Sequence, residues 1–217
     1  MLALLSHKVG VQSPMFNAGE GLKLTPVKLI KDGGSSNNYS FSMPCHGGTH
    51  VDAPKHFDDS GRPIASFSLE ELAFERPTLL DVPKSDGELI VRKDLEPFQR
   101  AIGRADLLLL RTGWERLREP DPHRFSTRNP GMSEEGSDYV RTFTGLRALG
   151  LDSISLSSVP HREEGRSAHR SLLKGRDFLI VEDMHLSDYP IGIKRIIVSP
   201  ILLEGVDSAP CTVIAEL

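Results

Sequence analysis

The segment 45–57, which reads Cys-His-Gly-Gly-Thr-His-Val-Asp-Ala-Pro-Lys-His-Phe, constrains this chain more than any other stretch. Three histidines and one carboxylate fall within eleven residues, among glycines and a proline. Imidazole and carboxylate groups together form the ligand set of a borderline divalent metal such as zinc or manganese. The alternative is a polar surface loop that happens to be rich in histidine, but such a loop has no need of glycines that bring the backbone close. We therefore predict metal ligands here, namely His46, His50 and Asp52, with His56 just beyond them.

The spacing within this segment predicts how its backbone runs. His46 and His50 would share one face of a helix, but the two glycines between them disfavour a helix. A tight Gly-Gly turn followed by a short extended piece fits better, because His50 and Asp52, two residues apart on a strand, point to the same side. Pro54 then ends the strand, so that His56 approaches the same site from a loop.

Composition and charge exclude several classes of protein. A chain of 217 residues fits one domain, 1–217, and its formal net charge of −4 gives no electrostatic case for nucleic acid or an anionic membrane as a partner. No apolar stretch approaches the length of a membrane span, and two cysteines do not make a disulfide framework, so we expect a cytoplasmic protein. The chain has no nucleophile elbow, no phosphate-binding loop and no dinucleotide fingerprint, which argues against a serine hydrolase and against nucleotide binding.

Hydrophobic periodicity predicts strands that alternate with helices. The clearest strand is 106–111, because its four consecutive leucines suit a strand buried on both faces. Expected strands are 38–43, 78–82, 106–111, 154–157, 178–181, 195–198 and 212–215, and expected helices are 67–73, 92–102, 133–149 and 168–175. Segment 121–130 is expected to be a surface loop. The pattern predicts an α/β or α+β domain with a mixed sheet.

The run His-x-Gly-Thr-His-x-Asp-x-Pro-x-His-Phe, unbroken from His46 to Phe57, resembles the signature of the cyclase family of metal-dependent hydrolases. That family includes the bacterial kynurenine formamidases and the isatin hydrolases. The landmarks 107–114, 130–133 and 200–210 extend the resemblance over nearly the whole chain. The resemblance implies a swivelling β/β/α arrangement in a single domain, a homodimer, and a small-molecule substrate.

The resemblance also implies a second group of ligands in the far half of the chain. In the family, a histidine on a short helix and a glutamate at the end of the next strand complete a two-metal site. The runs Ala-His-Arg-Ser-Leu-Leu and Leu-Ile-Val-Glu match these elements and point to His169 and Glu182. Glu182 also has a physical argument, because a carboxylate at the end of a buried strand is costly unless it is paired or bound to metal. The alternatives are a surface salt bridge for Glu182 and an exposed helical histidine for His169.

The remaining histidines carry weaker signals. His161 lies in a charged stretch directly after an expected strand end, where it either binds substrate near the mouth of the pocket or belongs to a solvated loop. His7, His123 and His185 are interpreted as surface or structural residues. The chain departs from the kynurenine formamidase pattern at 155–158, where Ser-Leu-Ser-Ser stands in place of a Ser-x-Asp element, and it lacks a tryptophan near residues 14–16.

These observations predict a metal-dependent hydrolase that acts on an amide, lactam or lactone bond of a small carbonyl compound. One or two divalent ions, zinc or manganese, lower the pKa of bound water and polarise the carbonyl. His56 serves as the general base for water and as the acid for the leaving nitrogen. Two alternatives stay open: a cyclase or dehydratase that runs a related step, and a non-catalytic metal-binding protein.

Overall fold

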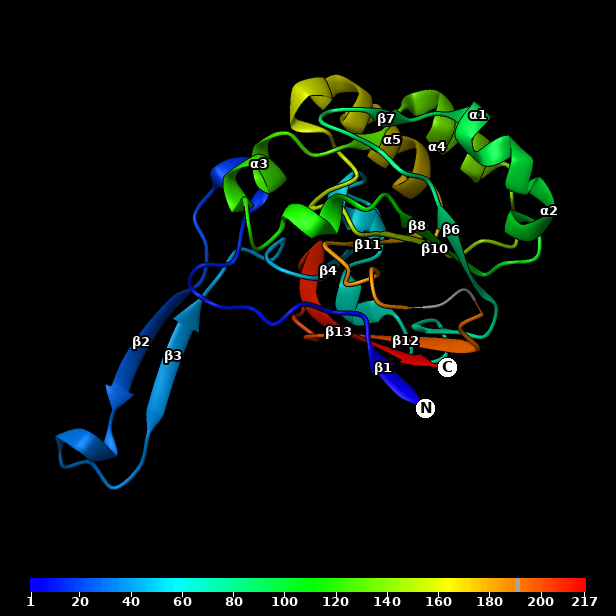
Figure 1. The fold of residues 1–217 in the computed structure, drawn as a ribbon. Coiled ribbons are helices and arrows are strands. Elements are labelled where there is room, and N and C mark those ends of the chain that lie inside the picture. Colours follow the sequence, from blue (N-terminus) through cyan, green and yellow to red (C-terminus); the bar gives the residue numbers. More distant parts are fainter. Residues whose placement is uncertain (190–191) are drawn as a thin grey trace.

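A computed structural model describes residues 1–189 and 192–217, and its centre is one mixed sheet (Figure 1). The strands follow the order β5 (Ala73–Phe74), β12 (Arg195–Pro200), β13 (Ser208–Glu216), β4 (His50–Asp52), β11 (Leu179–Glu182), β10 (Ala148–Leu151), β8 (Leu107–Arg111) and β6 (Pro77–Asp81), with β1 (Leu2–Leu4) paired to β13. Neighbours among β6, β8, β10 and β11 are parallel, whereas β4 is antiparallel to both β11 and β13. This arrangement confirms the predicted α/β fold with a mixed sheet.

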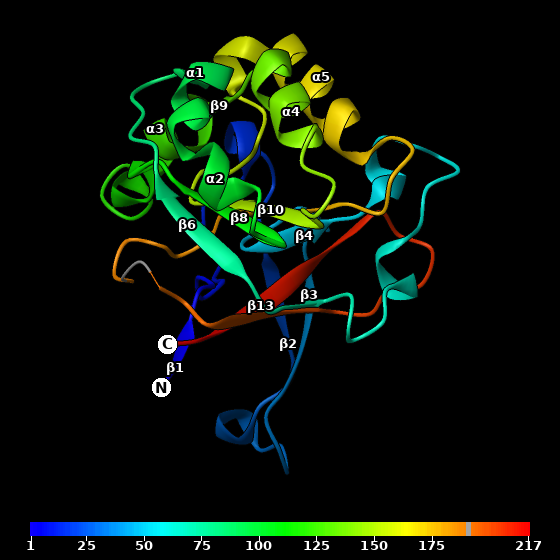
Figure 2. The same cartoon turned by 90° about the vertical axis from the view of Figure 1, so that its right-hand side faces the viewer.

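Both faces of the parallel strands are covered (Figures 1 and 2). On one face lie α1 (Arg92–Leu95), α2 (Gln99–Ile102), α4 (Glu134–Arg141) and α5 (Arg162–Leu173). Leu108 and Leu110 pack into the core on this side, and Leu107 and Leu109 pack into a second core with β12 and β13. All four leucines are fully buried, which confirms the strand expected at 106–111. Among the described helices, none is long and apolar enough to cross a membrane.

Most of the other expected strands are confirmed within one or two residues, but the helices needed correction. The expected helix at 133–149 ends at Arg141, and residues 148–151 form β10 instead. The strand expected at 154–157 is therefore six residues too late, and that segment is a loop. A short apolar run can form either a helix or a strand. Here residues 148–151 form a strand because they pair with β8 in the sheet.

Four further segments differ from expectation. The helix expected at 67–73 is a single turn, because the chain passes directly into β5 and buries Phe74. The helix at 92–102 is divided by a 3-10 turn at Glu96–Phe98 that contains a proline. The loop expected at 121–130 contains α3 (Pro122–Thr127), whose first turn is capped by the Asp121 side chain. The helix expected at 168–175 begins six residues earlier, at Arg162.

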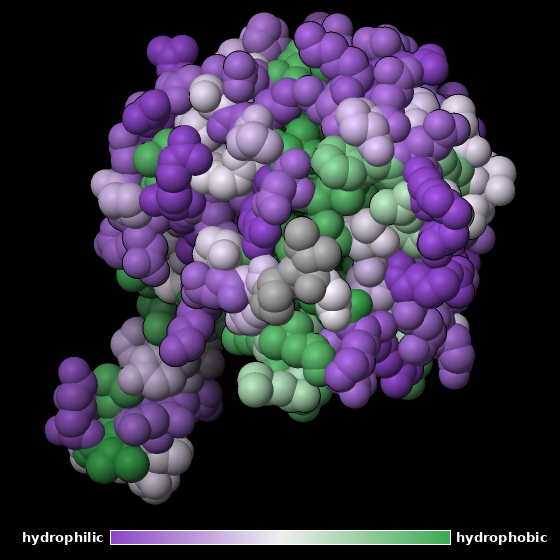
Figure 3. Space-filling view, turned by 45° about the vertical axis from the view of Figure 1, so that its right-hand side comes forward, coloured by the Kyte–Doolittle hydropathy of each residue, from purple (hydrophilic) through white to green (hydrophobic). Residues whose placement is uncertain are grey.

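One element stands away from the body. The strand expected at 38–43 is β3 (Asn38–Ser42), but it pairs only with β2 (Lys23–Lys28) in a projecting hairpin, here called the arm (residues 22–43) (Figure 1). Leu24 pairs with Phe41 and Pro26 with Tyr39, so these four residues share one face of the arm. Leu24, Tyr39 and Phe41 are between 50% and 62% exposed. Figure 3 shows the arm beside the body, with apolar side chains both at its tip and near its base.

The apolar face of the arm continues into the body. A recess of about 570 Å³ at its base is lined by Leu24, Phe41 and Met43 from the arm and by Val9 and Ile201 from the body, among others. An isolated two-stranded hairpin is marginally stable in water, and a continuous exposed apolar surface marks an interaction site. We propose that the arm of a second copy covers this surface, because one patch that offers both a projection and a recess suits a two-fold symmetric contact.

This proposal predicts that Phe41→Glu converts a dimer into a monomer, because the substitution puts a charge on the apolar face of the arm. Ser40→Glu is the matched control: it lies on the same strand, points to the opposite face, and should leave the dimer intact. Light scattering coupled to gel filtration measures the mass of each variant. A monomeric wild type, or a Phe41→Glu variant that stays dimeric, contradicts the proposal.

Candidate metal centre

The ligand segment enters the sheet through a turn that requires glycine. Gly48 has φ +65°, and a Cβ at this position would lie 2.4 Å from the Val9 side chain. The chain then forms β4, which places His50 and Asp52 on one side, and a 3-10 turn at Pro54–His56 follows. The predicted turn, strand and proline stop are all confirmed.

The sheet register brings the two halves of the chain together. Glu182, the last residue of β11, is the cross-strand partner of His50 on β4. Their side chains, together with Asp52, form a buried group in which Glu182 Oε2 lies 3.2 Å and Asp52 Oδ1 3.6 Å from His50 Nε2. All three residues are at most 3% exposed. The carboxylate that the sequence places at the end of a buried strand therefore faces the ligand segment.

The centre contains buried polar atoms without partners. Among the described residues, His50 Nε2 and both carboxylate oxygens of Asp52 make no hydrogen bond. Burying such atoms without compensation costs free energy, and an ionised carboxylate costs most. A divalent cation between these atoms removes that cost, so the residues present fit a metal ion.

Two further histidines face the same carboxylates. His169 from α5 places Nε2 3.2 Å from Glu182 Oε1 and 3.8 Å from Asp52 Oδ2. His46 places Nδ1 2.9 Å from Asp52 Oδ1 without the alignment of a hydrogen bond. Asp52 belongs to two groups of potential ligands, one with His50 and Glu182 and one with His46 and His56. The structure therefore brings all five predicted ligands together, with Asp52 in the middle.

In His50 and His169, the ring nitrogen that points away from the carboxylates donates a hydrogen bond to a backbone carbonyl. His50 Nδ1 donates to the Gly48 carbonyl at 2.8 Å, and His169 Nδ1 donates to the Gly165 carbonyl at 2.8 Å. Because a backbone carbonyl holds the Nδ1 proton of each ring, its Nε2 is directed at the carboxylates, which is the arrangement that metal-ligating histidines adopt. Glu182 is held in turn by the Leu156 backbone N–H, which donates to Oε1 at 2.6 Å.

Asp207, directly before β13, is a site residue that the sequence analysis missed. Its Oδ2 lies 3.0 Å from His46 Nε2 and 2.7 Å from His56 Nδ1. One carboxylate oxygen therefore orients both rings. A single aspartate outside any motif gives no local signal, and only its place in the closing region 200–210 linked it to the site.

His56 borders a pocket beside the centre. This cavity of about 320 Å³ is lined by the ligand histidines, by Glu182, and by Phe16, Phe57, Ile154, Ser155 and Ser157. His161 is not among the lining residues: it is exposed and directly precedes α5. Its side chain lies on the outside of the fold, where solvent rather than the pocket surrounds it.

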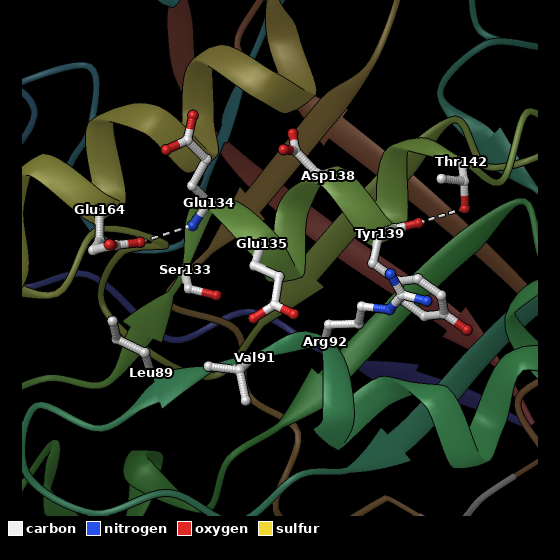
Figure 4. Close-up of a pocket in the computed structure, with 10 residues that line it drawn as sticks. All are labelled: Leu89, Val91, Arg92, Ser133, Glu134, Glu135, Asp138, Tyr139, Thr142 and Glu164. Carbon is white, nitrogen blue, oxygen red and sulfur yellow. Dashed lines mark hydrogen bonds between the residues drawn. The ribbon is translucent and has the colours of Figure 1, made fainter.

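A larger hollow lies elsewhere, over α1 and α4 (Figure 4). Its volume is about 920 Å³, and carboxylates from Glu134, Glu135, Asp138 and Glu164 surround it, with Arg92 over the Tyr139 ring. Of the His, Asp and Glu groups that converge within the described residues, none lies in this hollow. We therefore assign the chemistry to the smaller pocket.

The electrostatics of the metal-free centre follow from its charges. Burial lowers the pKa of His46, but the carboxylates of Asp52 and Asp207 outweigh burial and raise this pKa to about 9. Burial likewise opposes ionisation of Glu182, yet the adjacent His169 and His50 hold its pKa well below the usual range. Burial also lowers the pKa values of His50 and His169, but Glu182 and Asp52 outweigh it and raise both. At neutral pH the metal-free centre thus carries extra protons, the one on His46 among them, which a metal ion must displace.

Comparison with known proteins agrees with this geometry. A sequence profile of the cyclase family, described as "Putative cyclase", matches residues 4–158. "Cyclase-like protein 1" from Arabidopsis thaliana is 30% identical over 214 residues, which cover 95% of this chain and 81% of the relative. A protein named "Kynurenine formamidase" from Bacillus anthracis is 31% identical over 185 residues, which cover 83% of this chain and 80% of the relative.

A solved structure shows the same fold. Isatin hydrolase A from Labrenzia aggregata, bound to benzyl benzoate, superposes with a TM-score of 0.83 at 18% identity, covering 99% of this chain and 93% of that chain. The chain therefore belongs to the cyclase family of metal-dependent hydrolases, as the segment 46–57 indicated.

The shared position of Asp52 predicts that Asp52→Asn weakens metal binding at this centre by at least about 100-fold, because the change keeps the volume and removes the central charge. Glu182→Gln should act in the same direction. Glu163→Gln is the control, since that side chain is 85% exposed and, among the described residues, forms an ion pair only with Arg166. Metal titration of the metal-free protein measures the effect, and wild-type affinity in Asp52→Asn contradicts the assignment.

The proton on His46 predicts that metal affinity rises with pH. Because at least one proton is displaced, affinity should increase by about tenfold or more per pH unit from pH 7 and begin to level off near the His46 pKa of about 9. Titrations at pH 7, 8 and 9 measure the slope. An affinity that stays constant from pH 7 to pH 9 would show that His46 is not protonated in the metal-free protein.

Proposed function

We propose that this protein hydrolyses the C–N bond of a small amide or lactam and that its native metal is zinc or manganese. The observation that supports this most is the convergence of four ligand side chains on a fifth, Asp52, beside a pocket that is also lined by His56, which a carboxylate orients. The relative named kynurenine formamidase and the neighbour titled isatin hydrolase support an amide or lactam as the substrate class.

The metal would be held by the five converging side chains: His46, His50, Asp52, His169 and Glu182. When bound, a divalent ion polarises the substrate carbonyl and lowers the pKa of a bound water. The protein fixes these ligands before the ion arrives, because each histidine is oriented by an acceptor behind it. Imidazole and carboxylate donors suit both zinc and manganese.

His56 is placed for proton transfer. Its Nδ1 donates to Asp207 Oδ2 at 2.7 Å, which leaves Nε2 as the basic nitrogen. Burial lowers the pKa of His56, and the neighbouring His46 and His169 add to this against Asp52 and Asp207, so the ring is neutral at neutral pH. Nε2 can therefore accept the proton of the attacking water and then deliver it to the leaving nitrogen.

The pocket walls suggest the shape of the substrate. Phe16, Phe57 and Ile154 supply apolar surface, and the Phe57 ring stacks on His169 with centroids 5.0 Å apart. A volume of about 320 Å³ is at the small end of the range for ligand pockets. We therefore propose a compact, flat substrate, such as an aryl formamide or a lactam fused to an aromatic ring.

Ring closure is the alternative reaction for the same site. Closure of an amino acid to a lactam is the reverse of lactam hydrolysis, so it uses the same metal and the same histidine. A screen of formanilides, lactams and lactones, together with the corresponding open-chain acids, distinguishes the two directions. A metal-loaded protein that is inert toward every compound favours a non-catalytic metal-binding role.

The role of His56 predicts that His56→Asn keeps the metal and lowers kcat by about 10²–10⁴-fold, the usual loss when a general base is removed. Asp207→Asn should lower kcat less, since His56 stays in place with its orientation weakened. Elemental analysis and steady-state kinetics on the best substrate of the screen measure both quantities. Unchanged kcat in His56→Asn removes the residue from the mechanism, and loss of metal makes it a ligand instead.

A further inference from the structure

A second convergence of metal-ligand side chains lies outside this centre. His7, Glu115 and His185 come from three distant parts of the chain, and their ligand atoms lie within 4.8 Å of one another. From the sequence, His7 and His185 are interpreted as surface or structural residues. Glu115 lies in the short 3-10 turn Trp114–Leu117 after β8.

One oxygen of Glu115 faces both histidines. Glu115 Oε1 lies 3.6 Å from His7 Nε2 and also contacts His185 Nδ1. The other oxygen, Oε2, accepts the backbone N–H groups of Leu186 and Ser187 at 2.8 and 2.9 Å. The carboxylate is therefore fixed by the backbone on one side and presents a single oxygen to the two rings on the other.

The bare nitrogen of His7 distinguishes this group from an ordinary ion pair. His7 Nε2 is buried, and within 1–189 and 192–217 it has no hydrogen-bond partner. A Glu115–His185 ion pair accounts for those two residues but leaves the buried nitrogen of His7 facing a carboxylate at 3.6 Å with no bond. An uncompensated buried nitrogen of this kind costs free energy, and a cation between it and Glu115 would satisfy it.

The orientation of His185 is also that of a ligand. Its Nε2 lies 3.4 Å from Asp188 Oδ2. A carboxylate behind one ring nitrogen favours the proton there and leaves the other nitrogen bare, as behind ligating histidines generally. Arg118, a buried cation that lines the same recess, is paired with Asp183 at 2.8 Å, so its charge is already balanced.

We propose that His7, Glu115 and His185 form a second metal site, separate from the main centre, for one zinc-like divalent cation. Two histidines and one glutamate are a known zinc ligand set, and bonds of about 2.0–2.1 Å in a tetrahedron place ligand atoms roughly 3.3 Å apart. The distance of 3.6 Å between His7 Nε2 and Glu115 Oε1 is close to that spacing, and the direct contact between Glu115 and His185 would open to admit the ion. All three residues line a recess of about 560 Å³, from which a water molecule would complete the coordination.

A metal at this second site would hold together two segments that carry ligands of the main centre. The His7 backbone N–H donates to Thr49 Oγ1 at 3.0 Å, and that hydroxyl donates to the Asp183 carbonyl at 2.6 Å. Thr49 precedes the ligand His50, and Asp183 follows the ligand Glu182. A metal on His7 and His185 therefore ties together the segments that carry two ligands of the main centre, and its binding should stabilise the fold.

The test is a zinc titration of the metal-free full chain, using Zn²⁺ itself as the probe and reading bound equivalents and melting temperature. His7→Gln and His185→Gln should each bind one equivalent fewer than wild type and lose part of the zinc-dependent rise in Tm. His123→Gln, an exposed histidine on α3, is the control and should match wild type.

A second measurement starts from Asp52→Asn, in which all three residues of the second site are unchanged. In Asp52→Asn, where the main centre is disabled, one tight zinc equivalent should remain, and adding His185→Gln should remove it. Wild-type stoichiometry in both histidine variants, or no tight zinc in Asp52→Asn, overturns the second site. Either result leaves the assignment of the main centre and of the hydrolase activity untouched, since those rest on other residues.

Discussion

The structure depends on one buried carboxylate. Asp52 is 1% exposed, and both of its oxygens face imidazole nitrogens without a hydrogen bond from any described residue. In water these oxygens would be fully solvated, so their burial costs several kcal/mol of solvation free energy that contacts within the protein do not offset. A bound divalent cation would offset this cost. The cation that compensates the burial of Asp52 is therefore the same ion that a metal-dependent hydrolase needs for its reaction.

The fold gives this carboxylate its surroundings. β4 is only three residues long, yet it lies between β11 and β13 in the middle of the sheet. Its position aligns His50 with Glu182 across one ladder, while Asp207 at the start of the adjoining strand reaches His46 and His56. Buried leucines on both faces of the parallel strands keep this frame rigid. A stiff frame matters because misplaced ligands lose both metal affinity and rate.

The sequence predicted the ligand segment 46–56 better than it predicted the helices. The segment 46–56 carries its own geometry, since a Gly-Gly turn, a two-residue period and a proline leave few other paths for the backbone. His169 and Glu182 came from family resemblance, and only Glu182 had a physical argument as well. Asp207 lay beyond prediction, because a lone aspartate is defined by the register of β13 and not by its neighbours in sequence. The strand β10 was predicted at the wrong place for a related reason. The apolar runs 148–151 and 154–157 look alike in the sequence, and only the pairing with β8 shows which of them is the strand.

The most direct test of this account is anomalous diffraction from crystals of the protein as purified, measured on both sides of the zinc and manganese absorption edges. A metal ion held by Asp52 should give a strong peak within about 2.0–2.2 Å of an Asp52 carboxylate oxygen and of His50 Nε2, which identifies the element and its ligands together. A centre in which the Asp52 oxygens are bonded only to ordered water, in protein that is catalytically active, contradicts it.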